Sequence, residues 1–292
     1  MIKTKPLVAA ACGILALAGM TANAQTLSSE TFAGYTPGTM LRNDTPSPAT
    51  AGYTGNWTAV DFGATGAGTI AGALSYGGAG YNNDGVNHIG VAADAAGIQY
   101  GSSGRDYRLL GSTTTVTAST VGTIYLSFLF QSGQEYGATT YQMLDLYNGN
   151  TADANRTFTA GLTQNGGNSG NQYDFGVNEA YSNFGVSANT GVHLFVAEFN
   201  LSATAGADSV TVWLDPTLGL GNPAGGVTVS GQNIAFDRLS ISDYSGNSAN
   251  WGNIRFGTTF DAVTIAPMPE PSTLALAGLG GLALLFRRRA KN

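Results

Sequence analysis

The chain has 292 residues, of which 42 are glycine and only 10% are charged, and its formal net charge is −6. Residues 25–266 contain no lysine and 17 acidic residues against six arginines, a net charge of −11, which excludes a nucleic-acid-binding protein because phosphate contacts need clustered Lys and Arg. The single cysteine, Cys12, excludes a disulfide framework, so this middle segment must be held together by core burial alone.

The first 24 residues predict a secretory signal peptide. Lys3 and Lys5 form a basic start, an apolar stretch follows over residues 7–18, and Ala22 and Ala24 provide an A-x-A cleavage site. The apolar stretch is shorter than the roughly 20 residues that a membrane helix needs. Most of it also follows Cys12, which argues against acylation of that cysteine. We therefore expect export through the Sec translocon and a mature chain that begins near residue 25.

Residues 25–266 predict an all-β domain. Apolar residues alternate with period two over 124–131, 192–199 and 209–215, which is typical of strands. Further strands are expected at 68–76, 141–147, 156–162, 172–177, 233–241 and 260–265, with Gly- and Asn-rich turns between them and no helix. Residues 125–130 and 192–199 are apolar on both faces, as in central strands with a second layer against them. With no repeat and no linker, the pattern favours one antiparallel sandwich or barrel.

The acidic residues and histidines of this domain show no catalytic pattern. A glycosidase needs two carboxylates side by side, but no acidic residue lies two positions from any glutamate of the domain, namely Glu30, Glu135, Glu179 and Glu198. His193 and Glu198 are five residues apart, so a regular strand places them on opposite faces. We expect His193 and His88 to be surface histidines without a role, and Glu198 to cap a strand end or face solvent. A G-x-S-x-G nucleophile motif is also absent from the sequence, so no catalytic residue is predicted and the protein is not expected to be an enzyme.

Residues 77–85, GGAGYNNDG, partly match a calcium-binding β-roll nonapeptide. Asn82 stands where that repeat has Asp, and only one copy is present, whereas such repeats need stacked neighbours. A Gly/Asn-rich loop is therefore the favoured interpretation. Asn82 and Asp84 are weak candidates for a single calcium ion, and no other cofactor or metal is expected.

Two tryptophans are candidates for glycan contact, because an aromatic face offers apolar area to a sugar ring. Trp213 lies on the polar side of its strand, opposite the face that carries Val210 and Val212. Trp57 follows a Gly-rich turn. Packing against a second sheet or a covering loop explains Trp213 equally well.

The C-terminal segment 267–292 combines a Pro269-Glu270-Pro271 motif, an apolar run and three arginines, Arg287, Arg288 and Arg289. As a helix, the 13 residues 274–286 of the apolar run would be about 20 Å long, short of the roughly 30 Å hydrocarbon core. The glycines of the apolar run lower its helix propensity. The three arginines are expected to hold the end of the run at the cytoplasmic face of the membrane. We expect transient insertion into the inner membrane, with a plain C-terminal anchor as the alternative.

Several stretches together resemble one family. They are residues 30–60, with an F-x-x-Y-x-x-G-x-x-L pattern, "TIYLSFLFQSG" (123–133), "DSVTVWLDPTLG" (208–219), residues 236–264 and the tail. The chain is similar to PEP-CTERM proteins that carry a concanavalin A-like (lectin/glucanase-like) jelly-roll sandwich. The resemblance implies an antiparallel jelly-roll β-sandwich over 25–266 and a closing hairpin within 236–264. One departure is Asn253, which replaces an acidic residue often found there and puts a calcium or edge role at that position in doubt.

The same resemblance implies that an exosortase recognises the tail of a Gram-negative exported protein, cuts it near the motif, and releases the protein to the cell surface or the exopolysaccharide matrix. We therefore predict a non-catalytic exported surface or extracellular-matrix protein. A carbohydrate-binding, lectin-like module that contacts extracellular polysaccharide is the first alternative. A glycan-active hydrolase is the second.

Overall fold

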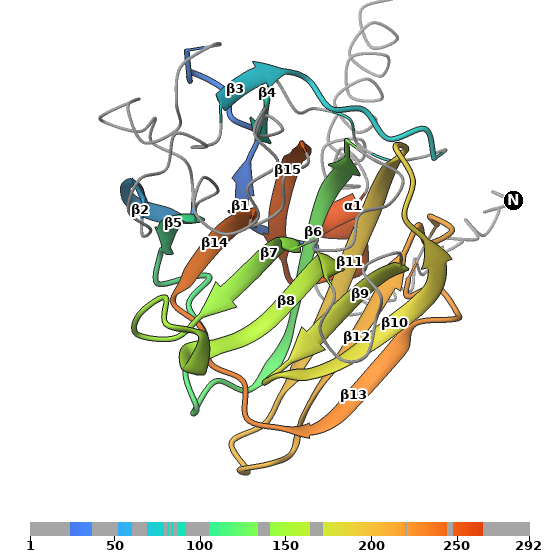
Figure 1. Ribbon diagram of the computed structural model, residues 1–292. Coiled ribbons are helices and arrows are strands. Elements are labelled where there is room, and N and C mark those ends of the chain that lie inside the picture. Colours follow the sequence, from blue (N-terminus) through green and yellow to red (C-terminus); the bar gives the residue numbers. More distant parts are fainter. Residues whose placement is uncertain are drawn as a thin grey trace, which may run out of the picture.

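The computed structural model describes residues 24–36, 52–59, 69–78, 81, 83, 87–91, 105–133, 141–163, 172–219, 221–243 and 248–264. These residues form two antiparallel β-sheets that pack face to face (Figure 1). The predicted all-β antiparallel sandwich is therefore confirmed.

The first sheet has eight strands in the order β13-β12-β11-β6-β15-β4-β3, with β1 paired to β15. Its strands are β1 (Thr26–Glu30), β3 (Thr69–Gly72), β4 (Asn87–Val91), β6 (Gly122–Ser132), β11 (Val192–Leu201), β12 (Asp208–Leu214), β13 (Val227–Gln232) and β15 (Ala249–Gly257). The second sheet has seven strands in the order β10-β9-β8-β7-β14-β5-β2. Its strands are β2 (Tyr53–Ala59), β5 (Arg105–Leu110), β7 (Tyr141–Tyr147), β8 (Arg156–Thr163), β9 (Gln172–Val177), β10 (Ala180–Ser187) and β14 (Arg238–Asp243).

The expected closing hairpin is wrong, because the last two strands belong to different sheets. β14 pairs with β5 and β7 of the second sheet, whereas β15 pairs with β6, β4 and β1 of the first. Leu239 of β14 and Phe256 of β15 are both buried in the core between the sheets. The chain thus crosses from one layer to the other so that both strands can place an apolar face against the same core.

The core lies between the two sheets and follows the period-two pattern. Phe128 of β6 stacks on Phe195 of β11 with ring centroids 5.0 Å apart, and Leu144 and Leu146 of β7 face them from the second sheet. A second apolar cluster lies on the outer face of the first sheet, where Leu129, Leu194, Val196 and Trp213 pack with Phe260 and Val263. This outer layer explains why β6 and β11 are apolar on both faces.

The segment that covers this outer face is a short helix, not the strand expected at 260–265. Helix α1 (Phe260–Thr264) buries Phe260, Val263 and Thr264. The Oγ1 of Thr259 accepts a hydrogen bond from the N–H of Ala262 at 3.1 Å, which satisfies a donor of the first turn as an N-cap does. With five residues, the helix is too short to show helical periodicity in the sequence.

Two other strands differ in extent from the prediction. The strand expected over 68–76 is limited to β3, and the one expected over 233–241 begins only at Arg238. Before Arg238 the backbone is held by other partners, because the N–H of Ile234 donates to Asp208 Oδ2 at 2.7 Å and Phe236 forms an isolated bridge with Val116. No helix within the described ranges is long and apolar enough to cross a membrane.

Candidate functional site

Several predicted site residues lie outside the described residues. They are Ala22 of the signal cleavage site, the calcium candidates Asn82 and Asp84, and the whole sorting segment, including Pro269, Glu270, Pro271, Arg287, Arg288 and Arg289. Ala24 is described and is exposed just before β1. In the part of the chain that the structure covers, no three His, Cys, Asp or Glu side chains come together as metal ligands.

The expected glycan contacts of Trp57 and Trp213 are not supported, because both rings are buried. Trp57 is 2% exposed, and its indole N–H donates to the Tyr35 hydroxyl at 3.0 Å. Trp213 is 5% exposed; its indole N–H donates to the carbonyl of Pro223 at 3.0 Å, and its ring meets Phe260 edge to face. Neither ring leaves a face open for a sugar, so packing is the correct interpretation for both.

His193 is not a surface histidine, as the sequence suggested. Its ring is buried at the end of the sandwich, with a centroid 4.5 Å from that of Tyr173 in the second sheet. Nδ1 lies 2.6 Å from Asp215 Oδ2, and Nε2 lies 2.9 Å from Asn189 Oδ1. These contacts tie β11 to the segment that follows β12, where Asp215 has a positive φ of 48°. The side chain of His88 lies outside the described residues.

Glu198 lies on the opposite face of β11 from His193, as their spacing predicts, but it neither caps a strand end nor lies free in solvent. Its Oε1 accepts from the hydroxyl of Tyr125 at 2.9 Å and its Oε2 from the amide of Asn222 at 3.0 Å. Burial, the hydrogen bond from Tyr125 to Glu198 and the nearby carboxylate charge raise the pKa of Tyr125 to about 12. Both carboxylate oxygens of Glu198 are thus engaged by protein groups.

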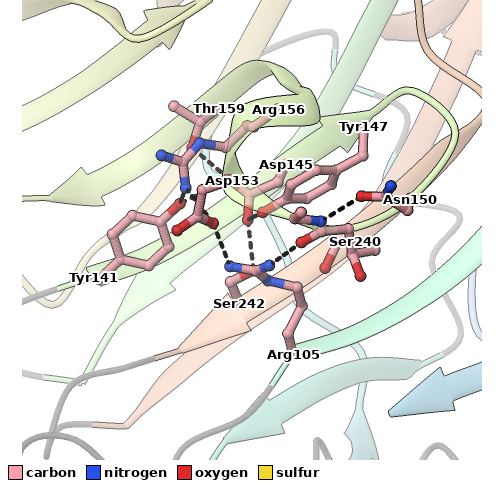
Figure 2. Close-up of polar contacts among 12 residues, drawn as sticks. Arg105, Tyr141, Asp145, Tyr147, Asn150, Asp153, Arg156, Thr159, Ser240 and Ser242 are labelled. Carbon is pink, nitrogen blue, oxygen red and sulfur yellow. Dashed lines mark hydrogen bonds and ion pairs between the residues drawn. The ribbon is translucent and has the colours of Figure 1, made fainter. Parts of the chain in front are cut away.

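A network of polar contacts lies on the outer face of the second sheet and is the candidate site (Figure 2). We call it the Asp145 cluster, and it comprises Arg105, Tyr141, Asp145, Tyr147, Asp153, Arg156, Thr159, Glu179, Tyr181 and Ser242. Strand alternation places it there, because Leu144 and Leu146 of β7 point into the core and their odd-numbered neighbours point away. The pairing of β7 with β8 and β14, and of β14 with β5, brings the four strands together beneath it.

Asp145 is fully buried at the centre of this cluster. Its carboxylate accepts hydrogen bonds from Thr159 Oγ1 at 2.6 Å, from Tyr141 OH at 3.1 Å and from Ser242 Oγ. Thr159 lies directly opposite Asp145 on β8, and Ser242 comes from β14 on the other side of β7. The carboxylate therefore bonds to both neighbouring strands through side chains, in addition to the backbone ladder.

Two buried arginines flank the carboxylate. Arg105 donates from Nε to Ser242 Oγ at 3.2 Å and from Nη2 to Asp153 Oδ1 at 3.2 Å, and it also donates to the carbonyl of Thr151. Its guanidinium carbon lies 5.0 Å from the ring centroid of Tyr147. In the ion pair between Arg105 and Asp153, the arginine side chain is 8% exposed and the aspartate side chain is 69% exposed. The arginine is thus a buried member of the cluster and Asp153 lies at its rim.

Arg156 repeats this arrangement on β8. Its Nε and Nη2 donate to Glu179 Oε1 at 3.0 and 2.8 Å, and Nη2 also donates to Tyr181 OH at 3.1 Å. Its Nη1 donates to Tyr141 OH. The Arg156 side chain is 6% exposed, whereas that of Glu179 is 51% exposed. Both arginines therefore have an exposed acidic partner at the rim and a shared buried carboxylate, Asp145, at the centre.

Burial and neighbouring charges raise the pKa values of two tyrosines and two arginines of the cluster. Burial and the Asp145 carboxylate raise the pKa of Tyr141 and of Tyr147 well above the usual range, so both phenols stay protonated. Burial by itself lowers the pKa of Arg105 and of Arg156, but the Asp145 charge and the surrounding tyrosines outweigh it and raise both pKa values. At neutral pH Arg105 and Arg156 are therefore charged, and Tyr141 and Tyr147 are neutral.

This geometry is suited to holding strands together rather than to proton transfer. The tyrosines do not supply a phenolate base near pH 7, and the Asp145 carboxylate already accepts from four side chains. Sequence analysis did not identify the cluster. Its one visible signal was an aspartate between two leucines in the strand "YQMLDLY", whose other residues apart from Gln142 are apolar or aromatic.

Comparison with protein families identifies a sorting motif in the C-terminal segment. Residues 269–289 match the PEP-CTERM protein-sorting motif, which confirms the resemblance found in the sequence. This motif indicates an exported, surface-associated protein that is sorted through an exosortase. No curated protein matches the chain.

Some solved structures are similar to the sandwich at low identity. A carbohydrate esterase from the Shiga toxin-encoding bacteriophage phi24B is 12% identical, with 81% of this chain and 99% of that chain covered and a TM-score of 0.45. Cip1, a cellulose-induced protein, is 15% identical, with 70% and 91% covered and a TM-score of 0.42. The binding domain of botulinum neurotoxin serotype D is 8% identical, with 80% and 48% covered and a TM-score of 0.41. Likeness at this level supports no statement about activity or ligand.

Proposed function

We propose that the protein is a non-catalytic surface or extracellular-matrix protein, which an exosortase cuts near the Pro269-Glu270-Pro271 motif. The observation that carries the proposal is the match of residues 269–289 to the PEP-CTERM sorting motif. In this proposal the Sec translocon exports the chain, the tail holds it briefly in the inner membrane of a Gram-negative bacterium, and cleavage delivers the sandwich to the cell surface or the exopolysaccharide around it.

The chemistry of the tail suits a segment that is read and removed. Proline fixes φ and favours an extended backbone, so Pro269 and Pro271 suit the extended form in which a protease accepts a substrate. The apolar run after it is short and contains Gly278, Gly280 and Gly281, so it makes a weak permanent anchor. Arg287 and the two arginines after it oppose its passage through the membrane. These features favour a temporary stop before cleavage.

A non-catalytic sandwich is supported by the contacts that three of its acidic groups make. Asp145 and Glu198 each have their carboxylate oxygens engaged by hydroxyl or amide donors. Glu30 accepts from the backbone N–H of Phe32 at 2.8 Å and from Arg108 at 2.8 Å. A hydrolase needs a carboxyl group that can exchange a proton with substrate, and these three are committed to contacts that hold strands in place.

The proposal is tested by changing the motif and following the protein through cell fractions. With Pro269→Ala and Pro271→Ala together, we expect an uncut chain that stays in the membrane fraction, while the wild-type protein is released. Pro267→Ala is the matched control, because it removes a neighbouring proline outside the motif and should be processed normally. Release of the double variant at the wild-type size would overturn the proposal.

Carbohydrate binding is the second candidate, and the rim of the Asp145 cluster favours it. Asp153 and Glu179 expose carboxylates next to Arg105 and Arg156, and Tyr181 is half-buried beside Glu179 with its hydroxyl 3.2 Å from Glu179 Oε2. Such a mixture of charged, hydroxyl and aromatic groups is what saccharide hydroxyls bind. A glycan array that shows sub-millimolar binding, lost in Glu179→Ala but kept in the distant Glu198→Ala, would support it.

A further inference from the structure

Two strands end the two sheets on the same side of the molecule. β13 is the last strand of the first sheet and β10 the last strand of the second, as Figure 1 shows at the margin of the sandwich. They lie side by side, and the amide of Asn178, just before β10, donates to Gln232 Oε1 at the end of β13 at 3.0 Å. Among the described strands, none pairs with the outer edge of either one.

The two edge strands and the segments that follow or precede them in the sequence contain no charged residue, although the domain is acidic. No Asp, Glu, Lys or Arg occurs within residues 180–197 or 216–236, whereas residues 25–266 as a whole carry a net charge of −11 from 17 acidic residues and six arginines. β13 itself contains neither lysine nor proline. Edge strands are normally protected from further pairing by such residues, so β13 is an edge without that protection.

The apolar residues on this side are incompletely covered. Val227 and Val229 of β13 and Phe184 of β10 pack against the core cluster but remain only partly buried. Val186, at the end of β10, is 39% exposed. These side chains stop short of full burial because the sheets end here, and one more strand at a spacing of about 4.8 Å would cover them.

The two edges differ in how regular they are. β10 loses its register with β9 between Asn183 and Ser187, where Gly185 has a φ of 68°. β13 pairs with β12 in unbroken register from Val227 to Ser230, and its irregularity is confined to the far end at Gly231. A regular edge of four residues is a template for another strand, whereas a bulged edge is not. The open template is therefore β13.

We propose that β13 pairs with β13 of a second copy of this chain, antiparallel and about a two-fold axis, so that two first sheets become one continuous sheet. A second copy is the occupant because two molecules of the same acidic protein repel each other at charged surfaces and approach best through an uncharged side. A two-fold axis also makes one strand complementary to itself, as an antiparallel pair requires. The inference concerns the sandwich alone and does not depend on how the tail is processed.

Sedimentation velocity of the protein in the form that cells release, over a dilution series from micromolar to nanomolar, tests the pairing. The wild-type protein should be dimeric at the upper end and dissociate on dilution. Thr228→Lys places two lysines close together across the axis and should weaken the dimer by about tenfold or more. Leu109→Lys is the control, since Leu109 is 39% exposed on β5, far along the second sheet from β10, and adds the same charge without touching β13. A wild-type protein that is monomeric throughout overturns the proposal, as does equal weakening by both variants.

Hydrogen exchange gives a second readout that needs no variant. The backbone amides of residues 227–230 should exchange more slowly as the wild-type concentration rises through the dimer range, while those of the bulged strand β10 around Gly185 should change less. Exchange at 227–230 that is independent of concentration, in a protein that sediments as a dimer, would place the contact elsewhere and refute the pairing of β13.

Discussion

Replacing Asp145 by Asn tests whether the Asp145 cluster is structural, because it removes one negative charge with little change in shape. Asp145 is fully buried and accepts from Thr159, Tyr141 and Ser242. In the variant the carbonyl oxygen still accepts, but the new amide nitrogen, a donor, faces hydroxyl groups that were donating. Arg105 and Arg156 also lose the buried anion that raises their pKa values.

The size of the effect follows from these contacts. A hydrogen bond to a charged group contributes about 1.5–3 kcal/mol, and removing one partner of a buried charged set costs about 3–5 kcal/mol. These are two descriptions of the same loss, so they are not added. We expect Asp145→Asn to lower the free energy of unfolding by about 3 kcal/mol, which shifts the midpoint of urea unfolding by roughly 1 M.

Asp153→Asn is the matched control, since it makes the same chemical change in the same cluster at a side chain that is 69% exposed. An exposed ion pair contributes about 0–1 kcal/mol, so this variant should unfold close to the wild-type midpoint. Urea unfolding followed by tryptophan fluorescence measures both. If Asp145→Asn unfolds within error of Asp153→Asn, the cluster does not hold the strands together and the structural interpretation is wrong.

Other predictions follow from buried groups elsewhere. Glu30→Gln should lower the free energy of unfolding by about 3–5 kcal/mol in urea unfolding, because it removes the carboxylate charge that lies 2.8 Å from the buried guanidinium of Arg108; wild-type stability would contradict this. Trp213→Phe should cost about 1–2 kcal/mol through the lost bond to the Pro223 carbonyl and a small void, and a glycan array should show no change; loss of glycan binding would restore Trp213 as a contact residue. Burial and a nearby carboxylate raise the pKa of Tyr173 to about 12, while the unfolded phenol ionises near pH 10. The unfolded state therefore binds fewer protons between these values, and thermal melts should show stability falling as pH rises from about 10 to 12; melting temperatures that stay level across this range would contradict it.

Sequence analysis located some strands to the residue. The bounds of β7 and β9 match the expected 141–147 and 172–177, because a Gly- and Asn-rich turn directly follows the first and directly precedes the second. Strand β10 was missed because, as an edge strand, it is largely exposed and shows little alternation. Helix α1 was taken for a strand because Phe260 and Val263 give one apolar contact per turn, too few in five residues to reveal a helical period.

The Asp145 cluster could not be predicted from the sequence, for a different reason. Asp145 and Ser242 are 97 residues apart, and Arg105 and Asp153 are 48 apart, so their contacts arise only from the order β8-β7-β14-β5 in the second sheet. Strand order between distant segments leaves no local pattern. Trp57 and Trp213 were overvalued as glycan contacts for the same reason, since the groups that bury them, Tyr35 and Phe260, are far from them in the chain.

The intact mass of the protein recovered from the cell exterior tests the central claim most directly, because it determines both ends of the chain together with its location. We expect a mass that lacks the first 24 residues and the segment that follows the Pro269-Glu270-Pro271 motif, including Arg287, Arg288 and Arg289. A mass that still includes Asn292 would contradict cleavage by an exosortase.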